Sequence, residues 1–239
     1  MQLKIKNISI IGLGLIGGSI AKAIKNNSNS YNISAYDNNE TLSKALSENV
    51  IDNVIDNPKF AINSDLIFLC LPIEENVRIF KYLAPLLKKN CVITDVSGVK
   101  LIFQKEWEKL NSNGIYIGGH PMTGKEKGGF ENSDPLLFEN CVYILTEDLS
   151  KNNDLLEFRK IIELLGANIL YLPPKQHDVI AASVSHLPQL LSVALVNTAS
   201  LKTDKYNFLD LAAGGFRAVS YTHLRAHETV LDLVCRLLL

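Results

Sequence analysis

The chain has 239 residues, of which 47% are hydrophobic and 21% are charged, with 24 basic and 25 acidic side chains. This composition is typical of globular proteins with one or two domains and excludes a disordered, collagen-like or coiled-coil chain. A net charge of -1 provides no basic field for a phosphate polymer, so we expect no nucleic-acid partner. No uninterrupted apolar run approaches the ~20 residues of a membrane helix, and the first residues lack the apolar core of a signal peptide. We therefore expect no membrane partner and a cytoplasmic location.

The cysteines indicate buried thiols rather than a metal site. They form no CxxC pair, and three of the four lie inside apolar runs typical of strands. The four are Cys70, Cys91, Cys141 and Cys235. We expect neither a metal ion nor a disulfide framework.

The first half of the chain alternates short apolar runs with helical patterns, which predicts parallel strands joined by crossover helices. The predicted strands of the sheet are Ile8–Ile11, Ile33–Tyr36, Leu66–Leu71, Val92–Thr94, Ile115–Ile117 and Val142–Leu145. A further helix, with an apolar stripe between Leu155 and Leu165, precedes a strand over Ile169–Leu172, and Pro173-Pro174 ends this unit. The pattern indicates an α/β fold with a doubly wound parallel sheet of the Rossmann type in residues 1–172.

After the two prolines the strand pattern stops, and Gln176–Leu201 reads as a long helix rich in Ala, Leu, Val and Ser. We place a domain boundary here, with a partial helical domain over residues 173–217. Such a short domain buries little core by itself and needs the first domain or another subunit for support. We therefore expect a homodimer.

A glycine-rich turn follows the first predicted strand and opens the first predicted helix. Its sequence GxGxxG, in this context, is typical of a dinucleotide-binding turn, in which the helix N-terminus attracts the phosphates. Asp37, at the end of the second strand, can accept hydrogen bonds from the ribose hydroxyls, and no Arg follows it to hold a 2′-phosphate, which favours NAD over NADP. The alternative is a tight turn alone, with Asp37 capping the helix over Glu40–Leu46. The candidate cofactor-binding residues are Gly12, Gly14, Leu15, Ile16, Gly17 and Asp37.

A second candidate site lies in residues 118–129, which are dense in glycine and ionisable groups. His120 follows the strand over Ile115–Ile117, at the edge of a parallel sheet where ligands bind, and its imidazole can accept a proton from a substrate hydroxyl. The alternative is a turn histidine satisfied by the backbone. Ser185–Gln189 places His186 beside a proline on the helical side, nine residues after His177-Asp178.

Six motifs together resemble the prephenate dehydrogenase family, which includes arogenate and cyclohexadienyl dehydrogenases. They are GLGLIGGS at Gly12–Ser19, Leu69–Pro72, Thr94–Lys100, His120–Gly124 with Glu126, Ser185–Gln189 and Gly214–Arg217. The resemblance implies an NAD-binding Rossmann domain followed by a helical dimerisation domain. It also implies an enzyme of tyrosine biosynthesis that carries out the NAD-dependent oxidative decarboxylation of prephenate to 4-hydroxyphenylpyruvate.

The same resemblance implies roles for individual residues. His120 is the expected catalytic base, Glu126 gates or orders the site, and Ser97 lies beside nicotinamide and substrate, although family members often have Gly-Ser where this chain has Ser97-Gly98. His186 matches a family histidine of the second domain. Gln189 stands where a second histidine is frequent, and with Arg217 it is an expected substrate-binding residue.

Past Arg217 the chain departs from the family pattern, which continues with an Asp, a Thr and a further Arg. The segment Ser220–Leu231 resembles translated sequencing-adapter read-through, so we expect residues 218–239 to be a non-native tail and the chain to be a truncated form of the enzyme. The alternative is a short amphipathic helix, because Leu224, Leu231, Val234 and Leu238 share a face.

Three other functions fit parts of the sequence. An arogenate-preferring dehydrogenase differs only in how the pocket treats an amino group. Another NAD-dependent enzyme, acting on hydroxyacids or imines, resembles the first 70 residues but does not predict the His120 loop together with Ser185–Gln189. A non-catalytic module that senses NAD would bind the cofactor without turnover.

Overall fold

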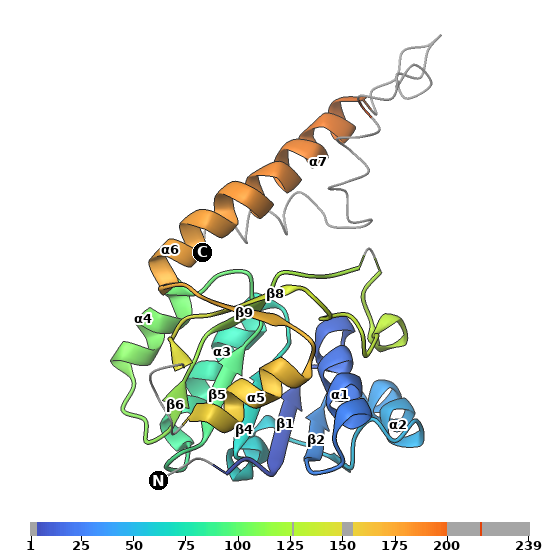
Figure 1. Ribbon diagram of the computed structural model, residues 1–239, viewed down its shortest axis with the longest axis vertical. Coiled ribbons are helices and arrows are strands. Elements are labelled where there is room, and N and C mark those ends of the chain that lie inside the picture. Colours follow the sequence, from blue (N-terminus) through green and yellow to red (C-terminus); the bar gives the residue numbers. More distant parts are fainter. Residues whose placement is uncertain (1–3, 126, 150–154, 200–215, 217–239) are drawn as a thin grey trace. The chain divides into compact units, whose positions relative to one another are not determined.

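The computed structural model describes residues 4–125, 127–149, 155–199 and 216, which divide after His177 into two compact units. The first unit is built on a six-stranded, all-parallel sheet of order β3-β2-β1-β4-β5-β6 (Figure 1). Its strands are β1 (Asn7–Ile11), β2 (Asn32–Tyr36), β3 (Asn53–Val54), β4 (Leu66–Leu69), β5 (Val92–Asp95) and β6 (Ile115–Tyr116). The strand order reverses between β1 and β4, and in such sheets ligands bind at the carboxyl ends of the strands beside this switch point. The predicted doubly wound parallel sheet is confirmed.

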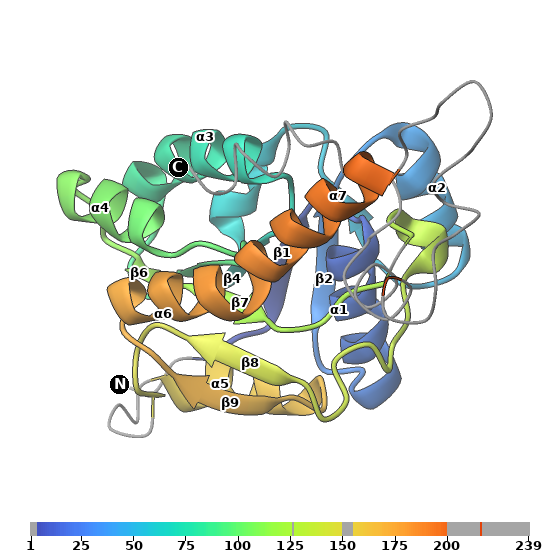
Figure 2. The ribbon, with the colours of Figure 1, turned by 90° about the horizontal axis from the view of Figure 1, so that it is seen from above.

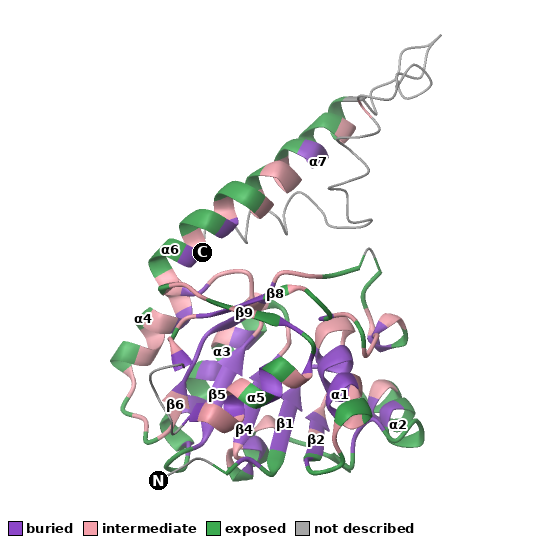
Figure 3. Cartoon of the chain, viewed as in Figure 1, coloured by how far each residue is buried: buried purple, intermediate pink, exposed green. Residues whose placement is uncertain are grey.

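Helices cover both faces of this sheet. They are α1 (Leu15–Asn27), α2 (Asn39–Ser47), α3 (Ile73–Leu83), α4 (Leu101–Lys109) and α5 (Leu156–Leu164), with short 3-10 turns at Pro58–Asn63, Ala84–Leu86 and Phe130–Asn132. Successive side chains of a strand point to opposite faces, so Leu66 and Phe68 of β4 join one core and Ile67 and Leu69 join the other. The first core includes residues of α1, α2 and α5, and the second includes residues of α3 and α4 (Figures 2 and 3). The sheet is therefore buried between two apolar cores.

A second, three-stranded sheet of order β7-β8-β9 corrects part of the prediction. It contains β7 (Gly119–Pro121), β8 (Val142–Leu145) and β9 (Asn168–Tyr171), with β7 antiparallel and β9 parallel to β8. The assignment of Val142–Leu145 to the main sheet is wrong, because an apolar run reports burial and not the sheet to which a strand belongs. The strand that takes its place in the main sheet is β3, a two-residue edge strand without an apolar run, which was not predicted.

Residues 174–199, the continuous described stretch beyond the second sheet, are helical, as predicted. They contain α6 (Pro174–Ala181), a π-helical segment (Ala182–His186) and α7 (Leu187–Ala199). The π-helical segment ends just before Pro188, whose missing N–H interrupts the regular hydrogen-bond ladder of an α-helix.

One described helix passes a length and composition test for a membrane span, although no uninterrupted apolar run in it approaches ~20 residues. Pro174–Thr198 is 25 residues long and contains an 18-residue window with a mean hydropathy of 1.7, so by length and composition it could cross a membrane. Polar residues such as Ser185 and Asn197 interrupt the apolar run, which is why a search for uninterrupted runs overlooked it. The exposed apolar side chains of this stretch are Val179, Ile180, Val184, Leu187, Leu191 and Leu195.

Candidate active site

In the turn between β1 and α1, each of the three glycines is explained by a different feature of its surroundings. Gly12 has a φ of +98°, and a Cβ there would lie 2.9 Å from the carbonyl atoms of Cys70. A Cβ at Gly17 would lie 1.9 Å from the Gly12 carbonyl oxygen, so this position lets helix and strand pack closely. At Gly14 no described atom lies within 4 Å of where a Cβ would stand, so this backbone faces open space. A ligand can approach the turn from that side.

The N-terminus of α1 suits an anion. Gly14 caps the helix without a side-chain hydrogen bond, and the first turn carries no acidic residue. The free N–H groups and the positive end of the helix macrodipole therefore face the open side of the turn, where phosphate groups can bind. These observations fit a dinucleotide pyrophosphate.

Asp37 lies at the carboxyl end of β2 and is bound to the glycine turn. Its Oδ2 accepts a hydrogen bond from the Leu13 N–H at 2.6 Å, and its Oδ1 accepts one from the Asn38 N–H at 2.7 Å. Asn38 is the residue that caps α2, because its side chain accepts from the Thr41 N–H at 2.9 Å. Asp37 is therefore not the helix cap that the alternative interpretation required.

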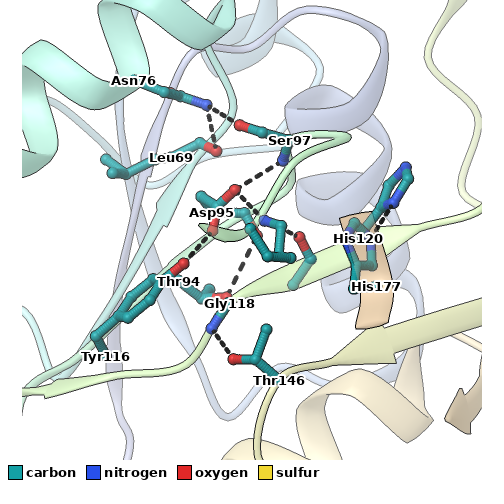
Figure 4. Close-up of polar contacts among 12 residues, drawn as sticks. Leu69, Asn76, Thr94, Asp95, Ser97, Tyr116, Gly118, His120, Thr146 and His177 are labelled. Atoms are coloured by element: carbon teal, nitrogen blue, oxygen red, sulfur yellow. Dashed lines mark hydrogen bonds and ion pairs between the residues drawn. The ribbon is translucent and has the colours of Figure 1, made fainter. Parts of the chain in front are cut away.

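His120 lies in β7, at the edge of the main sheet where the strands have their carboxyl ends. A Cβ at the neighbouring Gly119 would lie 2.8 Å from the carbonyl oxygen of Asp95, the last residue of β5. The His120 Nδ1 lies 2.8 Å from the Nε2 of His177 on α6, which is completely buried (Figure 4). His177 was not predicted as a partner, and the only signal for it is the His-Asp pair that follows the two prolines.

Ser97 follows β5 and is held at two atoms. Its backbone N–H donates to the Asp95 Oδ2 at 2.9 Å, and its Oγ accepts from the Asn76 Nδ2 at 3.2 Å. Asn76 is buried in α3, and its amide also bonds the Leu69 carbonyl and the Leu71 N–H at the end of β4. Because Ser97 accepts from Asn76, its hydroxyl hydrogen can donate to a different acceptor. Asn76 carried no signal in the sequence.

A buried ion pair lies beneath these residues. Lys100 bonds the Asp95 Oδ2, and both side chains have an exposed fraction of 0%. Lys100 also donates to the Gly119 carbonyl at 2.7 Å, and the Tyr116 hydroxyl donates to the Asp95 Oδ1 at 3.0 Å (Figure 4). The motif Thr94–Lys100 contains both charges, but their partnership was not predicted.

The remaining candidate residues divide into those outside and those inside the described ranges. Glu126 and Arg217 lie outside the described residues, as does the proposed tail over residues 218–239. His186 and Gln189 are half-buried in the helical unit, on the π-helical segment and α7 respectively. Their roles stay predictions.

The three cysteines among the described residues are free thiols whose pKa values are raised by burial. Burial raises the pKa of Cys70 far above its usual value, and it raises the pKa of Cys91 to about 12. A thiol that keeps its proton is a poor nucleophile and a poor metal ligand. Within the described ranges, no group of three His, Cys, Asp or Glu residues could hold a metal ion.

The sheet order and the turn that opens α1 make this chain a Rossmann-type nucleotide-binding protein. Residues 20–171 match the family model of the prephenate dehydrogenase nucleotide-binding domain, and residues 173–229 match that of the prephenate dehydrogenase dimerization domain. The chain belongs to the prephenate dehydrogenase family, as its motifs indicated.

Comparisons with known sequences and structures support this family membership. The chain is 36% identical over 216 residues to a prephenate dehydrogenase of Lactococcus lactis, covering 89% of this chain and 59% of that protein. It is 32% identical to a cyclohexadienyl dehydrogenase of Zymomonas mobilis, covering 89% of this chain and 74% of that protein. The structure of Aquifex aeolicus prephenate dehydrogenase in complex with hydroxyphenyl propionate and NAD+ superposes with a TM-score of 0.84 and 28% identity, covering 100% of this chain and 84% of that one.

Proposed function

We propose that the protein is an NAD-dependent prephenate dehydrogenase of tyrosine biosynthesis. Prephenate loses a hydride to NAD and its ring carboxylate as carbon dioxide, which leaves 4-hydroxyphenylpyruvate and NADH. The observation that carries the proposal is the His120–His177 pair, held at 2.8 Å at the ligand-binding edge of a nucleotide-binding sheet. Family membership and the NAD+ complex of the Aquifex aeolicus enzyme support the cofactor.

The cofactor would lie with its pyrophosphate on the open side of the turn at Gly12, Gly14, Leu15, Ile16 and Gly17. The fit rests on the open space at Gly14 and on the α1 N-terminus without acidic residues. The Asp37 carboxylate accepts hydrogen bonds from a ribose diol and repels a 2′-phosphate, so it selects NAD over NADP. The nicotinamide, when bound, supplies the hydride acceptor.

His120 takes the proton of the substrate hydroxyl. In the neutral imidazole one nitrogen is a donor and the other an acceptor. If the His120 Nδ1–H donates to the His177 Nε2, the His120 Nε2 carries the lone pair that receives the proton. His177 then stabilises the imidazolium by accepting from it. The aromatic ring formed on loss of carbon dioxide drives the reaction, so one base and correct positioning supply most of the catalysis.

The remaining residues of the proposal act on the substrate. Ser97 lies beside nicotinamide and substrate, and Glu126 gates or orders the site. His186 is a further catalytic residue from the second domain, and Gln189 and Arg217 bind substrate. Gln189 is a neutral amide, so it donates hydrogen bonds without the pH dependence of an imidazole. Arogenate is the alternative substrate, because it differs only by an amino group on the side chain.

The domain plan and partners belong to the same proposal. A Rossmann domain over residues 1–172 is followed by helical residues from 173, and the match to a dimerization domain supports a homodimer. A biosynthetic dehydrogenase of this kind would act in the cytoplasm.

The test is NADH formation at about 340 nm with prephenate and with arogenate. It is measured on this chain and on a version whose second domain is completed from a family member, because the chain spans 59% of the length of its Lactococcus lactis relative. Turnover in either version supports the proposal, and the faster substrate names the specificity. NAD binding without turnover in both versions would overturn it in favour of an NAD-sensing module.

A further inference from the structure

The Asp95–Lys100 ion pair is placed where it could control the geometry of the site. Both side chains are fully buried, and removing two charges from water carries a large cost that their mutual attraction must repay. Apolar side chains of similar volume would often serve the core as well or better. A buried pair at this position therefore calls for a role other than stability.

The bonds of the pair run to the two segments that carry the proposed chemistry. Asp95 accepts from the backbone N–H of Ser97 at 2.9 Å, which fixes the turn after β5. Lys100 donates to the carbonyl of Gly119 at 2.7 Å, and this peptide group leads directly into His120. The ion pair thus joins the Ser97 turn to the His120 strand.

A third contact limits the movement of the pair. The Tyr116 hydroxyl donates to the Asp95 Oδ1 at 3.0 Å, so both carboxylate oxygens have donors from defined directions. Lys100 also lies 5.3 Å from the ring centroid of Phe103, within the range of a cation–π interaction. With both ends held, the carboxylate and the ammonium have little freedom to reorient.

We propose that Asp95 and Lys100 are positioning residues, which set the orientation of His120 relative to Ser97 in the proposed dehydrogenase site. The inference rests on the proposed function, because His120 and Ser97 take their roles from it. The pair does not touch substrate or cofactor in this proposal. It acts through the peptide groups of Ser97 and Gly119.

The deciding variant is the double substitution Asp95→Asn/Lys100→Met in the full chain. Removing one partner alone would leave a buried charge and could unfold the protein, whereas removing both charges is often neutral for stability. We expect a thermal unfolding midpoint close to that of the wild type and an unchanged Kd for NAD. We expect kcat to fall by about tenfold to a hundredfold, because a displacement of the base by about 1 Å can cost a hundredfold in rate.

The matched control is Asp65→Asn/Lys88→Met, which removes an ion pair of 2.8 Å at the opposite end of the strands, with exposed fractions of 21% and 46%. It should change kcat by less than twofold. Imidazole NMR gives a readout that needs no turnover: the ring-nitrogen shifts of His120 should report one tautomer in the wild type and control, and a mixture in the Asp95→Asn/Lys100→Met variant.

The outcomes separate this inference from the proposed function. A folded Asp95→Asn/Lys100→Met variant with wild-type kcat and an unchanged His120 tautomer would overturn the positioning role. A wild-type protein that binds NAD but turns over neither substrate would overturn the proposed function, and the His120 tautomer would then decide the positioning role by itself. Unfolding of the double variant alone, with the control intact, would mean that the pair is structural and would also overturn the inference.

Discussion

At the scale of single residues, the His120–His177 pair makes the sharpest prediction. His120→Asn should lower turnover by about a hundredfold to ten-thousandfold, the usual contribution of a general base, and leave NAD affinity unchanged. His177→Gln keeps an acceptor for the His120 Nδ1–H and should retain most of the activity, whereas His177→Leu removes it and should not. Steady-state rates and fluorescence titration with NAD measure the two effects. Equal activity of the Gln and Leu variants would contradict the role of the 2.8 Å contact.

Asp37 is the proposed ribose ligand, and its carboxylate also supports the turn by accepting a hydrogen bond from the Leu13 N–H at 2.6 Å. Asp37→Asn keeps an oxygen for that bond and should relax the preference against NADP, since the repulsion of a 2′-phosphate is gone. Asp37→Ala should weaken the binding of both cofactors. The measurement is the ratio of kcat/KM for NAD and NADP in each variant. An unchanged ratio in both variants would exclude Asp37 as the ribose ligand.

The sequence could indicate functional residues only where neighbouring residues in the chain form a recognisable pattern. His120 lies in a glycine-rich stretch of sequence and Asp37 follows a strand at a fixed spacing from a glycine turn, so the amino-acid pattern alone marks both as candidates. His177 is 57 residues from His120 in the chain, and nothing local marks the two as partners. Asn76 is similar, because a buried amide in the first turn of a helix becomes informative only when its three partners are known.

At the scale of elements, the prediction succeeded where several sequence signals along one segment point to the same structure. The first strand and the helix that follows it combine an apolar run, a glycine turn and a helical stripe, and they form β1 and α1. The strand over Val142–Leu145 was predicted with the right bounds but assigned to the wrong sheet, because its apolar pattern is the same in either sheet. The edge strand β3 was missed because its two residues are both exposed and are too few to show a pattern of alternating apolar and polar side chains.

The packing of α5 against the loop before β2 predicts a loss of stability in alkali. The Tyr31 hydroxyl donates to the Glu157 Oε1 at 3.2 Å, and burial, together with the charge and hydrogen bond of Glu157, raises the Tyr31 pKa from 10.0 to about 12. Because the folded pKa is above the unfolded one, this stabilisation is complete below pH 10 and is lost as the pH rises toward 12.

The variant that checks this contribution is Tyr31→Phe, which has no proton to lose. Its free energy of unfolding should fall less between pH 10 and 12 than that of the wild type. Urea titrations at a series of pH values give the difference between the two curves, which removes the contribution of the other tyrosines. Parallel curves would show that Tyr31 ionises equally in both states.

At the scale of the whole molecule, the helical unit leaves an apolar surface that a single copy exposes. Val184, Leu187, Leu191 and Leu195 have exposed fractions of 45% to 61%, and they lie in residues that match a dimerization domain. Burying a Leu side chain contributes about 1.5 to 3 kcal/mol, so several such residues from two copies can hold a dimer together. The proposed homodimer would account for the apolar composition of Pro174–Thr198.

Leu191→Glu tests this proposal, because a charge placed in an apolar interface is costly on both sides of a twofold axis. Sedimentation equilibrium should give a dimer for the wild type and a monomer for the variant, with NAD affinity unchanged since the glycine turn belongs to the first unit. Leu136→Glu is the matched control: Leu136 has an exposed fraction of 60%, against 54% for Leu191, but lies in the Rossmann unit. A dimer that survives Leu191→Glu would exclude this surface as the interface, and flotation of the wild type with lipid vesicles would assign it to a membrane instead.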